Sequence, residues 1–195
     1  MKQDLLEFRD GIFALRTRRF GTIAEIMIKK IYNLEDSSSL AFDKINQGTN
    51  ERIEVKFSTV MKKNDARINE NNIISQCVKA NLANRAMKST ETNIYKFDCN
   101  IQQIKCVEFD ILYYGLFFSD KIEIFKMTKA QVLSCQGYSN RQHRGNEGEG
   151  QFHLNQDNLN YHRENYLQKS ITYEELYELF SEGWCFFNKI VFISA

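Results

Sequence analysis

The sequence contains no proline, one tryptophan and only nine glycines among its 195 residues. The absence of proline removes the commonest marker of a boundary between domains, and no repeat or low-complexity linker stands in its place. No stretch approaches the roughly 18 apolar residues that cross a bilayer, and the first residues lack the apolar segment of a signal peptide. We therefore expect one domain over residues 1–195, in a soluble cytoplasmic protein with no membrane partner.

The charge balance and the cysteine spacing exclude further classes. Lys and Arg number 26 against 25 for Asp and Glu, so the net charge of +1 excludes a polycation that binds nucleic acid through bulk charge. A polyanionic partner must meet a local basic patch instead. The five cysteines are scattered and never spaced as C-x-x-C, which argues against a disulfide framework and a zinc ribbon.

The order of helical and extended patterns predicts an α/β fold. Helical patterns cover residues 3–33, with a break near Gly21, and residues 71–88, 128–135 and 172–182. Extended patterns cover residues 40–45 and 52–60, two strands within 104–127 joined at Ser119 and Asp120, and residues 184–187 and 190–193. The predicted buried stripes are Ile23, Ile26, Met27 and Ile31 on the first helix and Ile74, Cys77, Val78 and Leu82 on the second. We expect a single domain with a central mixed β-sheet flanked by helices.

The most informative pattern lies on the second extended stretch. Glu54 and Lys56 are two residues apart on an alternating strand, so they share a face opposite Ile53 and Val55. Asp43 ends the preceding stretch, and if the two stretches are neighbours, two carboxylates and one lysine converge. Oxygen ligands of this kind suit Mg²⁺ held with several waters. The pattern therefore predicts metal-assisted hydrolysis of a phosphodiester, in which Lys56 orients the attacking water or offsets developing negative charge.

Through Asp43, Glu54 and Lys56 the sequence resembles the PD-(D/E)XK nuclease superfamily, and within it the small type II restriction endonucleases. The resemblance covers residues 17–60 in motif and, more loosely, the strand pair over 110–127. Phe42 stands where the superfamily places a proline before the aspartate. The resemblance implies a restriction endonuclease-like fold and adds Glu25, on the preceding helix, as a catalytic residue and metal ligand beside Asp43 and Glu54.

Residues 136–168 are expected to form a long loop that recognises DNA, because they combine glycines with many Asn, Gln, Arg and His residues and show little apolar periodicity. Arg pairs well with guanine, and Asn or Gln pairs well with adenine. A basic N-terminal region is expected to contact phosphates. The candidate DNA-binding residues are Arg16, Arg18, Arg19, Arg141, His143, Arg144, Asn155 and Gln156, with Gln142, Asn158 and Arg163 as further members.

The leading hypothesis is a Mg²⁺-dependent type II restriction enzyme that cuts double-stranded DNA at a specific site. It would act as a homodimer whose symmetry matches a palindrome, with a DNA methyltransferase as its companion. One alternative is a structure-specific nuclease of repair or recombination. Another is a non-catalytic binding module in which Glu54 and Lys56 belong to a solvated strand face. A ββα-metal nuclease is disfavoured, because no Asp-His pair accompanies His143, His153 and His162.

Overall fold

The computed structural model describes residues 3–142 and 147–181. Over this part the chain is α/β, as predicted. A mixed six-stranded sheet has the order β1-β2-β3-β5-β6-β9, and a three-stranded sheet has the order β4-β8-β7. Strands β3 and β5 are parallel, and the other neighbours in both sheets are antiparallel. The strands predicted at 184–187 and 190–193 lie outside the described residues.

The larger sheet contains β1 (Glu35–Asp36), β2 (Lys44–Asn46), β3 (Glu51–Thr59), β5 (Ile111–Phe117), β6 (Ile122–Thr128) and β9 (Leu167–Ile171). The smaller sheet contains β4 (Asp98–Ile104), β7 (Ser139–Arg141) and β8 (Glu147–Asn155). The helices are α1 (Gln3–Ala14), α2 (Thr17–Tyr32), α3 (Ile73–Lys79), α4 (Leu82–Arg85), α5 (Lys129–Ser134) and α6 (Leu159–Tyr166), with a 3-10 turn η1 at Ser89–Glu91 and a further helix over residues 173–181. None of the helices in the described ranges has the length and apolar character needed to cross a bilayer.

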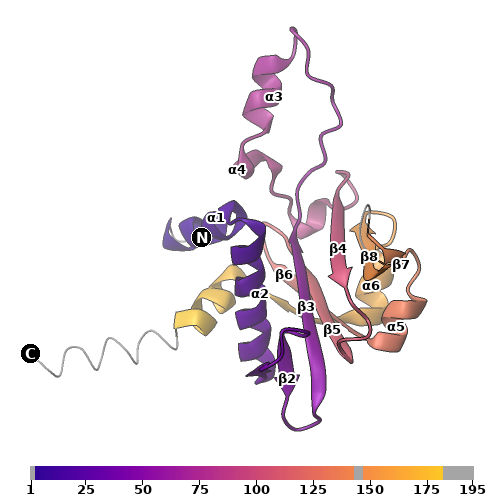
Figure 1. Ribbon diagram of the computed structural model, residues 1–195. Coiled ribbons are helices and arrows are strands. Elements are labelled where there is room, and N and C mark those ends of the chain that lie inside the picture. Colours follow the sequence, from indigo (N-terminus) through magenta and orange to yellow (C-terminus); the bar gives the residue numbers. More distant parts are fainter. Residues whose placement is uncertain (1–2, 143–146, 182–195) are drawn as a thin grey trace, which may run out of the picture.

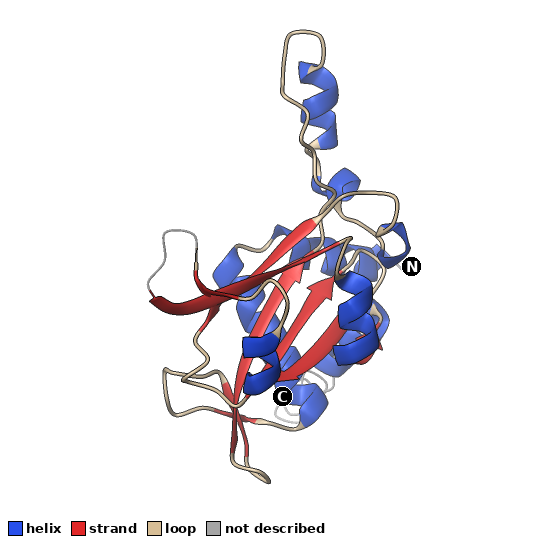
Figure 2. Ribbon diagram, turned by 90° about the vertical axis from the view of Figure 1, so that its right-hand side faces the viewer, coloured by secondary structure: helices blue, strands red, loops and turns tan. Residues whose placement is uncertain are grey.

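The larger sheet lies between two layers, as Figures 1 and 2 show. Helices α1 and α2 and the helix over 173–181 cover one face, where Ile53, Val55 and Tyr113 enter an apolar core. The smaller sheet, α5 and α6 cover the other face, where Leu112 and Tyr114 enter a second core. Successive residues of a strand alternate between these two cores, which is why β5 is buried along its whole length and lies in the centre, as predicted.

The N-terminal helix is broken at a different place from the one predicted. The chain is helical through Gly21 and breaks before Thr17, where Arg16 is extended with φ −69° and ψ 152°. The buried residues of α2 are Phe20, Ala24, Met27 and Ile28. Ile26, which we placed in the buried stripe, is 41% exposed, because it lies at the side of the stripe that α2 packs against the sheet.

The helix predicted over residues 71–88 was wrong in extent and in packing. It is two short helices, α3 and α4, and α3 lies on an arm that projects beyond the end of β3 (Figure 1). Ile74 is 80% exposed and Val78 is 60% exposed, whereas Gln76 is buried and its Oε1 accepts a hydrogen bond from Asn64 Nδ2 at 2.5 Å. The amphipathic spacing misled because the arm leaves both cores, so its apolar side chains have no core to face.

The prediction of a long loop over residues 136–168 was also wrong. The segment contains β7, β8 and α6. Strand β8 pairs with β4, and Phe152 and Leu154 enter the core beneath the smaller sheet while Gln151 and His153 face outward. Polar and apolar residues alternate along β8, and its outward-facing polar residues gave the segment the composition of a loop. Neither α6 nor most of β4 was predicted.

Candidate active site

The candidate site lies at the part of β3 that no longer pairs with β2. In the described ranges β2 pairs with β3 over residues 51–53, so the outer edge of β3 is open from Glu54 onward. Asp43 precedes β2 instead of ending an extended stretch. Its N–H donates to the Ile53 carbonyl at 3.0 Å, and its carboxylate accepts a hydrogen bond from the Val55 N–H at 2.8 Å. The side chain of Asp43 thus takes the place of a neighbouring strand at Val55.

Glu54 and Lys56 lie on one face of β3, as residues two apart on a strand must. Their registers opposite Leu112 and Tyr114 place them on the face that carries the smaller sheet. The Lys56 ammonium forms an ion pair with the Glu54 carboxylate. Glu54 is only 8% exposed, and Lys56 is partly buried, so the pair is not a solvated strand face.

Burial dominates the electrostatics of this pair. Burial raises the pKa of Glu54 from its ordinary value of 4.5 to about 7, with Lys56 lowering it and the nearby Asp43 and Glu108 carboxylates raising it further. Burial lowers the pKa of Lys56, but the carboxylates of Glu54, Asp43 and Glu25 outweigh that effect and raise it overall. Lys56 therefore stays cationic. For Glu54, the attraction of Lys56 is too weak to offset the cost of burying a negative charge, so its protonated form is favoured.

Two hollows meet at these residues. The smaller encloses about 260 Å³ and contains four carboxylates against two ammonium groups. The larger encloses about 800 Å³ between α2, the open edge of β3 and β4. Lys56 and Gln103 line both hollows. The residues lining the smaller hollow are Leu40, Ala41, Asp43, Glu54, Lys56, Gln103, Lys105, Glu108 and Glu149.

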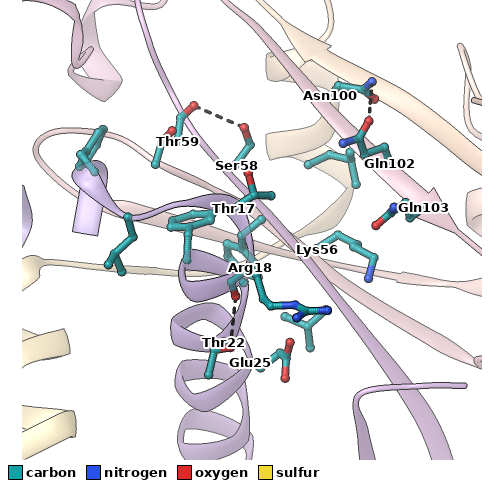
Figure 3. A pocket seen from close by; sticks show the side chains of 17 residues that line it. Thr17, Arg18, Thr22, Glu25, Lys56, Ser58, Thr59, Asn100, Gln102 and Gln103 are labelled. Atoms are coloured by element: carbon teal, nitrogen blue, oxygen red, sulfur yellow. Dashed lines mark hydrogen bonds between the residues drawn. The ribbon is translucent and has the colours of Figure 1, made fainter. Parts of the chain in front are cut away.

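Glu25 and Arg18 reach the larger hollow from α2, and Figure 3 shows the Arg18 guanidinium between Glu25 and Lys56. Glu25 Oε2 accepts a hydrogen bond from Lys44 Nζ at 3.3 Å. Glu25 lines the larger hollow but not the smaller one, which Asp43 and Glu54 line. Over residues 3–142 and 147–181, no three His, Cys, Asp or Glu side chains are placed to hold a metal ion by themselves.

The chemistry of the smaller hollow nevertheless fits Mg²⁺. This ion usually takes one or two protein carboxylates and completes its shell with water and substrate phosphate, so Asp43 and Glu54 suffice as protein ligands. The raised pKa of Glu54 points the same way, because a bound cation would restore the anionic form that burial disfavours. Glu25 does not complete a set of three ligands in this geometry.

The other candidate DNA-binding residues are dispersed. Arg16 and Arg19 are exposed near the start of α2, and the exposed Arg141 forms an ion pair with Glu147 at 3.1 Å. Asn155 and Gln156 line a separate hollow with His153, Lys63 and Lys96, at the far end of β8 from Glu149. Arg163 is held by the buried Glu123 at 2.9 Å, so it is not available to a base. His143 and Arg144 lie outside the described residues.

The described histidines have structural partners. His162 is buried, its Nδ1 shares a hydrogen bond with the Tyr114 hydroxyl at 2.8 Å, and burial lowers its pKa to about 4. His153 Nδ1 lies 2.7 Å from the Asp98 carboxylate. Neither lines the hollow that contains Asp43 and Glu54, so they give no support to a ββα-metal site.

Four polar residues of the smaller hollow were not anticipated: Gln103, Lys105, Glu108 and Glu149. They come from β4, from the connection between β4 and β5, and from β8, and the pairing of β4 with β8 brings the two strands together. No local sequence signal marks them. Neither models of known protein families nor curated proteins match this chain, so its function is inferred from the site itself.

Proposed function

We propose that this chain is a Mg²⁺-dependent endonuclease that hydrolyses phosphodiester bonds in double-stranded DNA, with a restriction endonuclease-like fold. The observation that carries the proposal is the ion pair between Glu54 and Lys56 beside Asp43, all three lining one hollow at the open edge of β3. A solvated strand face would not bury a carboxylate to this degree or hold a second carboxylate beside it.

Each of the three residues has a role that its contacts support. When bound, Mg²⁺ polarises the phosphate and lowers the pKa of a water molecule. Asp43 and Glu54 would hold the ion, and the Val55 N–H fixes the Asp43 carboxylate in place. Lys56 keeps its proton, so its ammonium is suited to orient the attacking water and to offset negative charge that develops on the phosphate.

The basic side chains of α2 supply contacts to the DNA backbone in this proposal. Arg18 lies in the larger hollow near Lys56, and Arg16 and Arg19 extend the exposed positive charge along the start of the helix. Glu25 lies at the rim of the same hollow, where its negative charge supports the protonated form of Lys56. A homodimer would place two such sites on the two strands of a palindrome, as in a type II restriction enzyme of the cytoplasm with a companion methyltransferase.

The test is incubation of the purified chain with unmethylated phage DNA, with Mg²⁺ and with excess chelator. Discrete fragments that require Mg²⁺ are expected of a sequence-specific endonuclease. A smear would favour a structure-specific repair or recombination nuclease with the same residues. Intact DNA at every Mg²⁺ concentration would contradict the proposed nuclease activity and favour a non-catalytic binding module.

A further inference from the structure

The strand β4 departs from regular alternation next to the site. Cys99 and Ile101 are buried and Asn100 and Gln102 face outward. In strict alternation Gln103 would turn into the core. Instead the pairing with β8 shifts between Gln102 and Ile104, so that Gln102 and Gln103 are both exposed and Ile104 returns to the core. This β-bulge adds an extra amide to the outer face.

The bulge places Gln103 in a conformation that glutamine rarely adopts. Its φ is +60°, in the left-handed region, which costs about 1 kcal/mol for a residue with a side chain. Bulges of this kind commonly turn a side chain toward a functional site. Here the Gln103 side chain lies beside Lys56, and it lines both hollows (Figure 3).

The outer face of β4 and β8 continues this amide character away from the site. Gln102 is opposite Gln151 in the register, and Asn100 Nδ2 donates to Gln151 Oε1 at 3.0 Å. Asn100 Oδ1 is buried and, within the described ranges, has no hydrogen-bond partner. The outer face thus presents a row of adjacent amides, and the last of them, Gln103, lies beside Lys56. We call Asn100, Gln102, Gln103 and Gln151 the amide face.

We propose that the amide face reads base edges of the DNA, with Gln103 contacting the base nearest the phosphate that is cut. The inference rests on the proposed endonuclease function. The major groove admits paired antiparallel strands, and β4 and β8 pair in this way with β4 at the edge of the three-stranded sheet. Asn and Gln amides pair with adenine through its N6 and N7 atoms. Recognition is thereby assigned mainly to β4, outside the segment 136–168 that composition suggested.

The experiment compares three variants on unmethylated phage DNA with Mg²⁺, and the ends of the products are sequenced. Gln103→Gly removes the amide and suits the left-handed backbone, so its thermal stability should equal or exceed that of the wild type. Gln103→Asn keeps an amide and tolerates the same backbone. Gln168→Ala is the matched control, because Gln168 is an exposed amide on β9, at the other edge of the larger sheet.

We expect the wild type to prefer adenine at a position near the cut. Gln103→Gly should lower that preference at this position by about 10- to 100-fold while cleavage still requires Mg²⁺. Gln103→Asn should retain part of the preference, and Gln168→Ala all of it. Unchanged base preferences in Gln103→Gly, or wild-type cleavage without base preference, would overturn the inference and leave the endonuclease intact. Uncut DNA with the wild type would overturn the proposed function, and the inference with it.

Discussion

The carboxylate of Asp43 accepts a hydrogen bond from the N–H of Val55 at 2.8 Å, at the point where β2 stops pairing with β3. This contact connects the two parts of the motif, which are separated by the turn between the strands. It also holds a carboxylate beside the buried Glu54, whose pKa it helps to raise. One side chain therefore holds the backbone of β3 and contributes to the charge of the site.

Substitution of Asp43 separates these two roles. Asp43→Ala removes the acceptor and should lower the free energy of unfolding by about 1–2 kcal/mol. Asp43→Asn keeps an oxygen for the Val55 N–H and should cost less than half as much. Both variants should lose Mg²⁺-dependent cleavage, because the amide is a poor ligand for the ion. Urea unfolding and a cleavage assay check this, and cleavage at the wild-type rate by Asp43→Asn would contradict a role for the charge.

The pH dependence of stability reports on Glu54. Its pKa is about 7 in the folded chain and near 4.5 when exposed, so folding favours the protonated form. The stability from this group is fully present below pH 4.5 and is lost as the pH rises through 7. Without divalent cations, the wild type should therefore lose about 1–3 kcal/mol relative to Glu54→Gln between pH 4.5 and 8. Mg²⁺ should reduce the loss, and parallel urea titrations of the two proteins at each pH would reveal a constant difference if the account is wrong.

The contribution of Arg18 to DNA binding is measurable through salt. If its guanidinium meets a phosphate in the larger hollow, Arg18→Ala should weaken binding to all sequences alike and lower the salt slope of the binding constant by about 0.9. Lys169→Ala, on the exposed edge strand β9, is the matched control and should leave the slope unchanged. Titrations of a random duplex at several salt concentrations give both slopes. Equal slopes for Arg18→Ala and the wild type would mean that Arg18 makes no phosphate contact.

Two glycines should respond oppositely to alanine. A Cβ on Gly115, in β5, would lie 2.2 Å from the Glu123 carbonyl oxygen and 2.3 Å from the Phe57 ring, so Gly115→Ala should destabilise the fold by at least about 2 kcal/mol. A Cβ on Gly21, in α2, would meet nothing within 4 Å, and Gly21→Ala should stabilise the helix by about 0.5–1 kcal/mol. Thermal unfolding of both variants tests the packing of β3, β5 and β6, and a neutral Gly115→Ala would contradict it.

The sequence predicted the elements whose signals are local. The alternating pattern of β3 predicted that Glu54 and Lys56 share a face, and the apolar residues on both sides of Ser119 and Asp120 predicted β5 and β6. The capping box at Thr172 also forms, with its N–H bonded to the Glu175 carboxylate at 2.6 Å and the Glu175 N–H bonded to its hydroxyl at 3.1 Å. In each case neighbours in the chain determine the structure.

The features that were missed depend on contacts between distant segments. The sequence of β8 has the composition of a polar loop, and it forms a strand because it pairs with β4. Ile74 fits the spacing of a buried stripe, but it is exposed because it lies on the arm that projects from both cores. The position of Gln103 depends on a register shift against β8, which leaves no mark on composition or spacing. These properties follow from tertiary packing, which overrides local pattern.

The measurement that tests the central claim most directly is the cleavage rate of Lys56→Gln on unmethylated phage DNA with Mg²⁺, beside Lys169→Ala as a control. Thermal unfolding of each protein verifies that it is folded, and titration of a duplex without Mg²⁺ verifies that it binds DNA. The account predicts that Lys56→Gln cleaves about 100-fold or more slowly than the wild type while it binds DNA within a few-fold, and that the control cleaves normally. Cleavage by folded Lys56→Gln at the wild-type rate would contradict the assignment of this site.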